Sequence, residues 1–280
     1  MNRSIKILFA AFSFALLLSA CSDYNKILKS DSVDKKLAAA FKYYDSKDYY
    51  RAGTLFEQVI PLIRGREEAE RVQFLYAYTQ YYEKSYALSA FEFKNFYDTY
   101  GRSPYAEESL FLYAKSLYAD SPEFNLDQTN TETSIAAIQD FLNRYPESKF
   151  ADEANKMYEE LAAKLERKAF ESAKLYHQMR YYQAAVTAFN SFERSYPSSA
   201  FNEEASYYKI ISQFNLAEQS VPEKQRERYF DTIGFYQAFI DKYPNSRLLK
   251  SAENYYERST RALERIKAAP TAAQVEETNN

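Results

Sequence analysis

A tyrosine followed by a sharp turn recurs four times along this chain of 280 residues, and it constrains the fold more than any other feature. Three copies read Tyr-Pro-x-Ser, and a fourth is degenerate. The recurring tyrosines are Tyr100, Tyr145, Tyr196 and Tyr243, which lie 45, 51 and 47 residues apart. In each copy a phenylalanine stands four residues before the tyrosine, and another bulky residue stands three residues before that. The chain is therefore built from a repeated unit.

The local chemistry of one copy predicts two helices joined by a turn. Bulky side chains spaced by three and four residues form one face of an α-helix, and proline cannot continue that helix. We expect the serine of the turn (Ser148, Ser199 and Ser246) to cap the helix that follows. A helix–turn–helix unit with this period is typical of an all-α helical-repeat solenoid.

A second pattern divides the chain into helix pairs. In the second helix of each pair a small residue precedes a bulky one by four positions, as in Ala52 and Phe56. In three pairs another small residue stands twelve positions earlier. This spacing resembles the tetratricopeptide repeat and predicts five pairs and a capping helix, at 34–63, 66–100, 104–145, 149–197, 200–244 and 246–267. Surface loops are expected at 120–130 and 217–226, and a helix of about 45 Å at 149–178.

The amino-terminal segment has the pattern of an export signal. Residues 1–20 carry two basic residues and then a short apolar run, which ends in the sequence LSA before Cys21. This ending resembles the lipobox of bacterial lipoproteins, which implies cleavage before Cys21 and lipidation of this residue, the one cysteine of the chain. An ordinary secretory signal with an incidental cysteine is the alternative. We expect a lipid anchor on a membrane, a tether at 21–33 and a disordered tail at 268–280.

The composition gives little support for catalysis or for binding of nucleic acid. The formal net charge is −3, and it becomes −5 once the two basic residues of 1–20 are removed, so there is no electrostatic case for nucleic acid. The chain has four glycines and one histidine, His177, too few for a phosphate-binding loop or a catalytic triad. We predict a protein that is not an enzyme, without cofactor or metal, in which His177 is structural.

Aromatic residues supply the candidates for binding, since the chain contains 28 Tyr and 21 Phe. In tetratricopeptide arrays the first helices of the pairs line a groove, and tyrosines there present flat apolar faces with hydroxyl groups that suit an extended peptide. The groove candidates are Phe41, Tyr44, Tyr78, Tyr81, Tyr82 and Tyr118. The alternative is that such residues are core between the pairs, and this is the reading we favour for Leu37, Phe74 and Phe111.

The lipobox cysteine, the short segment after it, the repeats and the final helix together resemble the family of the D lipoprotein of the outer-membrane β-barrel assembly machinery (BamD). The most specific part lies at 161–205, where a long charged helix leads into the sequence YHQMRYYQAA and then into the turn at Tyr196. The resemblance implies a lipid-anchored scaffold on the periplasmic face of the outer membrane. Ser22, which follows the cysteine, is compatible with delivery to that membrane.

The resemblance also implies partners for the two halves of the chain. Repeats at 34–145 would receive the C-terminal strand of unfolded outer-membrane β-barrel proteins. Repeats and the capping helix at 146–267 would hold a periplasmic domain of the barrel assembly protein (BamA-like), with accessory lipoproteins. The candidates for this partner side are Arg247, Arg258, Arg261 and Arg265.

Two other classes of envelope lipoprotein share parts of the pattern. An adaptor in cell division or peptidoglycan attachment can also use Tyr-Pro-x-Ser helical repeats. Depletion would separate the two, because loss of barrel proteins favours assembly and defects of septation or wall favour the adaptor. A nutrient-capturing lipoprotein also uses helical repeats and aromatic platforms, but its sugar sites usually contain tryptophan, which this chain lacks.

Overall fold

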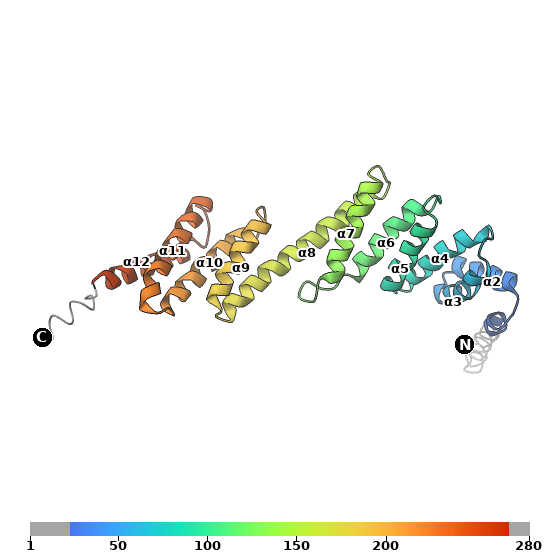
Figure 1. The fold of residues 1–280 in the computed structure, drawn as a ribbon, viewed down its shortest axis with the longest axis horizontal. Coiled ribbons are helices and arrows are strands. Elements are labelled where there is room, and N and C mark those ends of the chain that lie inside the picture. Colours follow the sequence, from blue (N-terminus) through green and yellow to red (C-terminus); the bar gives the residue numbers. More distant parts are fainter. Residues whose placement is uncertain (1–22, 269–280) are drawn as a thin grey trace, which may run out of the picture. The chain divides into compact units, whose positions relative to one another are not determined.

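The computed structural model describes residues 23–268, and within this range the elements are helices joined by turns and short loops (Figure 1). The elements are α2 (Val33–Asp45), α3 (Tyr49–Val59), η1 (Ile60–Leu62), α4 (Glu68–Tyr82), α5 (Tyr86–Thr99), α6 (Ala106–Asp120), α7 (Thr129–Arg144), α8 (Ala151–Gln178), α9 (Tyr182–Ser195), α10 (Asn202–Glu218), α11 (Pro222–Lys242) and α12 (Leu249–Ala268). The predictions for the signal at 1–20, for Cys21 and for the tail beyond Ala268 lie outside the described residues. Among the helices described, none is long and apolar enough to cross a membrane.

The helices confirm the predicted all-α, tetratricopeptide-like repeat. Successive helices pack against each other along the chain from α2 to α7 and from α9 to α12. Helix α8 contains 28 residues, which corresponds to about 42 Å, close to the length expected from the absence of Gly and Pro in this stretch. Helix α12 packs on α11 and α10 in the place of the predicted capping helix.

The segment before the first pair is folded where a tether was predicted at 21–33. Residues 23–28 are helical, and Tyr24 is buried. The Tyr24 ring meets that of Tyr43 edge-on, with 5.6 Å between the centroids, and the Arg51 guanidinium lies 5.2 Å from the Tyr24 ring. Tyr24 docks the segment on α2 and α3 together with Ile27 and Leu28, which are partly buried against the same core.

The prediction of a surface loop at 217–226 is wrong. Helix α10 continues to Glu218, and α11 begins at Pro222, so three residues connect them. Pro222 starts the helix, because the first turn of a helix needs no amide donor from this residue and favours its fixed φ angle. The other predicted loop is present at 121–128, where the Gln128 side chain donates to the Glu123 carbonyl at 2.8 Å.

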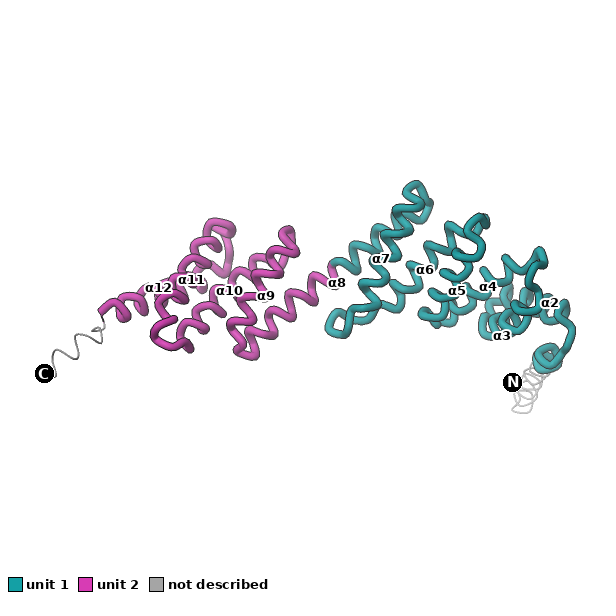
Figure 2. The backbone as a smooth tube through the Cα atoms, viewed as in Figure 1, with its two compact units in different colours: residues 1–162 teal, residues 163–280 magenta. Residues whose placement is uncertain are grey.

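The chain divides into two compact units, residues 1–162 and 163–280, which Figure 2 colours separately. Helix α8 begins in the first unit and ends in the second. Each unit buries phenylalanines of its own: Phe56, Phe93, Phe111 and Phe141 in the first, and Phe170, Phe189, Phe214 and Phe239 in the second. Both units therefore contain hydrophobic core of the kind that the repeat pattern predicts.

Small residues allow paired helices to approach closely, as predicted. Ser89 of α5 and Ala77 of α4 are fully buried, and Ser89 Oγ donates to the Ala77 carbonyl at 3.3 Å. Ser109 of α6 is also fully buried and donates to the Phe93 carbonyl at 2.9 Å. Because each hydroxyl bonds to a carbonyl of the neighbouring helix, the serines are buried without an unsatisfied polar atom.

The serine of each Tyr-Pro-x-Ser turn forms two hydrogen bonds, in an arrangement that differs from the predicted helix cap. Ser199 Oγ accepts from the Phe201 amide at 3.0 Å, so it closes the turn before α10 begins. The same hydroxyl donates to Glu166 in α8, the first helix of the pair that this turn ends. The serine–glutamate pairs of the other turns are Ser103–Glu70, Ser148–Glu107 and Ser246–Glu203. The serine–glutamate hydrogen bond thus connects every turn to the first helix of its own pair.

The turn tyrosines are half-buried, whereas the phenylalanines four residues earlier are buried. Phe192 is 2% exposed, and the ring of Tyr196 packs against it with 5.3 Å between centroids. Phe239 and Tyr243 repeat this contact at 5.4 Å. The phenylalanine thus belongs to the core, and the tyrosine covers it from the turn.

Candidate functional site

The first unit carries a continuous line of tyrosine rings across α2, α3 and α4, which we call the aromatic ladder: Tyr44, Tyr49, Tyr82 and Tyr78. The ring centroids of Tyr44 and Tyr49 lie 5.6 Å apart, edge to face. Tyr49 and Tyr82 stack at 4.3 Å, and Tyr82 and Tyr78 stack at 5.7 Å. The structure therefore brings together three of the predicted groove tyrosines and adds Tyr49, which the sequence pattern missed.

The turn between α2 and α3 places Tyr49 in the ladder. Lys47 adopts a φ of 63°, and its amide donates to the Tyr44 carbonyl at 2.9 Å. The amide of Asp48 reaches back to the Tyr43 carbonyl at 2.9 Å, which completes a Schellman-type helix end. The chain reverses within a few residues, so Tyr49 at the start of α3 returns beside Tyr44 at the end of α2.

Two further predicted residues flank the ladder. Phe41 meets the buried Phe56 at 5.6 Å between centroids, and the Arg71 guanidinium lies 4.8 Å from the Phe41 ring. Tyr81 meets Tyr82 edge-on at 6.0 Å. Tyr81 thus extends the aromatic surface next to Tyr82, and Phe41 adjoins it through Phe56, whose ring centroid lies 6.3 Å from that of Tyr44.

Tyr118 lies on α6 and makes a different contact. Its hydroxyl donates to Glu160 in the first part of α8. Lys115, one turn earlier, pairs with Glu153 at 2.8 Å. Polar contacts thus join α6 and α8 beside the apolar residues that both helices bury. No ring contact joins Tyr118 to the ladder among those described in residues 23–268.

The phenols of Tyr44, Tyr78 and Tyr118 keep their protons at neutral pH. Burial raises the pKa of Tyr44 above its ordinary value, and the neighbouring Tyr82 adds to the shift. Burial, and then the hydrogen bond that Tyr78 donates to Glu108, raise the pKa of Tyr78. The hydrogen bond to Glu160 raises the pKa of Tyr118 to about 12. These three hydroxyls stay protonated, and those of Tyr78 and Tyr118 already donate to glutamates, so a ligand meets neutral aromatic surface.

Exposure separates the groove candidates from core. Leu37, Phe74 and Phe111 are 8%, 5% and 2% exposed, which confirms that they are core. Tyr82 is 45% exposed. The other predicted groove residues are half-buried, with part of each ring open to solvent. Tyr82 is consequently the ring of the ladder that is most available to a ligand.

The four predicted arginines of the second unit differ in their surroundings. Arg258 pairs with Glu218 at 3.2 Å, and its guanidinium lies 4.2 Å from the Phe214 ring. Arg261 lies 3.9 Å from Glu257, whereas Arg247 and Arg265 are exposed. Arg258 therefore contributes to packing within the unit, because its planar cation covers a buried aromatic ring.

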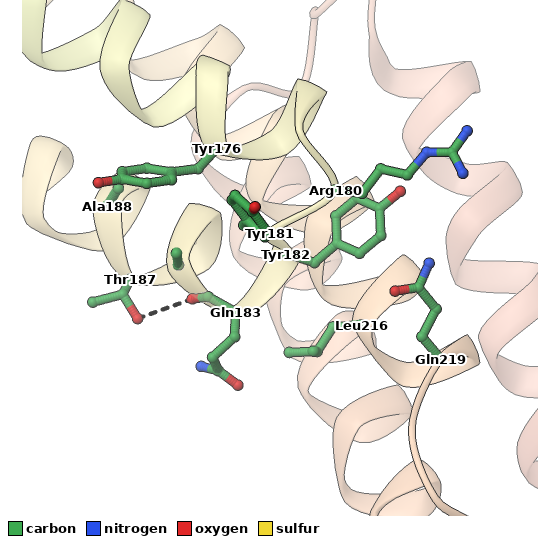
Figure 3. Close-up of a pocket in the computed structure, with 10 residues that line it drawn as sticks. Tyr176, Arg180, Tyr181, Tyr182, Gln183, Thr187, Ala188, Leu216 and Gln219 are labelled. Carbon is green, nitrogen blue, oxygen red and sulfur yellow. Dashed lines mark hydrogen bonds between the residues drawn. The ribbon is translucent and has the colours of Figure 1, made fainter.

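The second unit also contains a groove that was not predicted from the sequence. It has a volume of about 720 Å³ and lies where α8 ends, α9 begins and α10 ends (Figure 3). Tyr176 and Tyr181 on its border are 43% and 58% exposed. The lining residues are Tyr176, Arg180, Tyr181, Tyr182, Gln183, Ala184, Thr187, Ala188, Leu216 and Gln219.

Exposed apolar side chains are concentrated around this groove. Four large apolar residues within 175–181 are more than 40% exposed: Leu175, Tyr176, Met179 and Tyr181. Arg180 has a φ of 64°, so the chain turns sharply and presents these side chains on its outer side. Concentrated exposed apolar surface of this kind is typical of interaction sites.

His177 lies next to Tyr182 of this groove, with 5.7 Å between the ring centroids, and is a structural residue, as predicted. Its Nδ1 lies 2.9 Å from Ser212 Oγ on α10. Burial lowers the pKa of His177 below its ordinary value, which favours the neutral ring. Within the described part of the chain, no group of three or more His, Cys, Asp or Glu residues could hold a metal ion.

Comparison with known proteins adds an independent finding. The sequence model of a family described as YfiO, outer membrane lipoprotein, matches residues 31–228. A protein of Rickettsia prowazekii (strain Madrid E), named outer membrane protein assembly factor BamD, is 22% identical over 262 residues. The alignment covers 89% of this chain and 98% of that protein.

Proposed function

This chain belongs to the YfiO family of outer membrane lipoproteins, and on that premise we propose that it is a scaffold for outer-membrane β-barrel assembly. The named relative is an assembly factor for outer membrane proteins, and it aligns along nearly its whole length. The proposed role is non-enzymatic: it requires one binding surface on each helical unit and no reaction chemistry. The single observation that carries the substrate side is the aromatic ladder.

On the substrate side, the ladder would receive the C-terminal strand of an unfolded barrel protein. The stacked rings of Tyr49 and Tyr82 offer a flat apolar surface, and the protonated hydroxyl of Tyr44 next to it can donate to a carbonyl of an extended peptide. A tyrosine has few rotatable bonds, so its immobilisation costs little entropy on binding. A disordered ligand loses conformational entropy when it is ordered, and we expect a modest affinity, on the order of micromolar.

On the partner side, the groove at the α8–α9 turn supports docking of the periplasmic domain of a barrel assembly protein. It combines exposed aromatic rings with Arg180 and two glutamine side chains. Aromatic residues and arginine are the types that dominate binding energy in protein interfaces. We therefore assign the main partner contact to this groove, with Arg247, Arg261 and Arg265 as further candidates, also for accessory lipoproteins.

The lipid anchor at Cys21 would hold both surfaces at the periplasmic face of the outer membrane. The family is one of outer membrane lipoproteins, and the sequence before Cys21 has the corresponding signal. Several acyl chains on one residue give stable attachment without a membrane-spanning segment.

Binding of a peptide tests the substrate side. The probe is a fluorescently labelled synthetic peptide with the last strand of an outer-membrane barrel, which ends in an aromatic residue. Tyr82→Ala in the full-length protein should raise the Kd of this peptide about tenfold or more, because it removes the most exposed ring of the ladder. Fluorescence anisotropy measures the Kd.

Tyr50→Ala is the matched control, since Tyr50 is the same residue type, lies on α3 and is 69% exposed outside the ladder. It should leave the Kd within about twofold of the unmodified protein. Equal losses in the two variants, or no loss in Tyr82→Ala, would show that the ladder does not bind the peptide.

A further inference from the structure

Helix α11 covers one face of α10, and the contacts define that face. The Lys209 ammonium lies 5.0 Å from the Phe235 ring centroid. Gln213 Nε2 donates to Asp231 Oδ2 at 3.0 Å. In the connection after α10, Ser220 Oγ accepts a hydrogen bond from the Arg228 guanidinium. On the α11 side the contact residues are spaced by three and four, which is the stripe of one helix face.

The equivalent face of α12 is covered only in part, where Tyr256 stacks on Tyr236 of α11 with 4.8 Å between the ring centroids. The equivalent turn residues Tyr196 and Tyr243 are 47 residues apart. By the same spacing, Lys209 and Gln213 of α10 correspond to Tyr256 and Thr260 of α12. No helix among residues 23–268 follows α12 to cover this face. Instead, the face borders a groove of about 540 Å³ between α11 and α12. Its lining residues are Arg226, Phe230, Ile233, Tyr256, Thr260, Leu263, Glu264, Ile266 and Lys267.

We propose that this groove is a docking site for an amphipathic helix of another protein. The occupant would take the place on α12 that α11 takes on α10, with apolar residues at i, i+3, i+4 and i+7 against Phe230, Ile233 and Leu263. Phe230 is 53% exposed without such a partner. The rim of the groove has two basic residues, Arg226 and Lys267, and one acidic residue, Glu264. Acidic residues beside the apolar stripe of the docked helix would complement this excess of positive charge.

Residues 269–280 do not have the sequence pattern of this stripe. Residues 269–280, which follow α12 in the sequence, contain one large apolar residue, Val275. Eight of the nine lining residues also lie beyond residue 228, where the family match ends. The groove is thus separate from the ladder and from the groove at the α8–α9 turn, and its failure as a docking site would leave the proposed scaffold function intact.

A fused helix tests the proposal on the full chain. A short helix with leucines at i, i+3, i+4 and i+7 and glutamates on its flanks is joined to Asn280 through a flexible Gly-Ser linker. The linker gives a high effective concentration, so a helix that fills the groove should raise the Tm by about 4 °C or more. A helix of the same composition in scrambled order should leave the Tm unchanged. Phe230→Glu should abolish the rise, whereas Phe91→Glu, at a 64% exposed position on α5, should not.

The outcomes separate the possible occupants. An equal rise with the scrambled helix, or a rise that survives both Phe230→Glu and Leu263→Glu, would overturn the proposal. As a second measurement, analytical ultracentrifugation determines the oligomeric state of the unfused protein. A dimer that Phe230→Glu dissociates would identify a second copy of this chain as the occupant, and it would equally overturn docking of a partner helix. A monomer together with the sequence-dependent rise in Tm supports it.

Discussion

At Ser199 a single hydroxyl accepts from the Phe201 amide and donates to Glu166. Ser199→Ala removes both hydrogen bonds and should lower the free energy of unfolding by about 1 to 3 kcal/mol. Ser198→Ala is the control, because Ser198 is exposed in the same turn, and it should change stability by less than about 0.5 kcal/mol. Urea unfolding measures both variants. Similar effects in the two would mean that the serine–glutamate contact does not hold the turn.

His177 should make stability depend on pH in the mildly acidic range. Burial lowers its pKa from the ordinary value of 6.5, so the unfolded chain binds a proton at this residue more readily than the folded one. The contribution of His177 is therefore fully present above pH 6.5 and is lost as the pH falls through the unfolded and then the folded pKa.

We expect the free energy of unfolding of the unmodified protein to fall more steeply from about pH 7.5 to about pH 5 than that of His177→Gln. Urea unfolding at each pH measures the difference, and titration of the other residues cancels in the comparison. Parallel pH profiles would show that His177 is not buried against Ser212 as described.

Between elements, two glycines in helices give opposite expectations for the same substitution. A Cβ at Gly53 in α3 would lie 2.8 Å from Thr79 Oγ1 in α4, whereas a Cβ at Gly234 in α11 would meet no atom within 4 Å. Alanine favours a helix over glycine by about 1 kcal/mol. Gly234→Ala should therefore raise the Tm, and Gly53→Ala should lower it, because α3 and α4 must separate. Calorimetry of the two variants measures this, and a higher Tm for both would contradict the close packing of α3 on α4.

The helix pairs could be predicted from the sequence because their signals are local. A phenylalanine four residues before each turn tyrosine fixes where the second helix of a pair ends, and the small residues at Ala77 and Ser89 fix which faces meet. The same local logic placed Tyr44, Tyr78 and Tyr82 on one surface. It missed Tyr49, because Tyr49 joins the ladder only after the chain reverses at Lys47.

Two errors had a physical cause at the level of elements. Pro222 was interpreted as part of a loop, although proline at the first helical position starts α11. The many polar residues of 21–33 predict a tether, although Tyr24, Ile27 and Leu28 have the spacing of one helix face and pack on the first core. The groove at the α8–α9 turn needs side chains from three helices, and the sequence alone does not place Leu216 of α10 beside Tyr181.

For the whole molecule, the structure gives two compact units with separate cores and places one candidate surface on each. The aromatic ladder belongs to residues 1–162, and the groove at the α8–α9 turn belongs to residues 163–280. Helix α8 is the element that both units share. The central claim of the proposed scaffold is that these two surfaces bind different partners independently.

The most direct test is co-purification of two tagged full-length variants from cells depleted of the unmodified protein. One variant carries Tyr49→Ala and Tyr82→Ala, and the other carries Tyr176→Ala and Tyr181→Ala. Both should fold as judged by circular dichroism, since the altered rings lie at the surface or half-buried. After cross-linking, we expect the first variant to lose unfolded barrel proteins and retain the barrel assembly protein, and the second to do the reverse. Loss of both partners in each folded variant, or of neither, would contradict the two-surface scaffold.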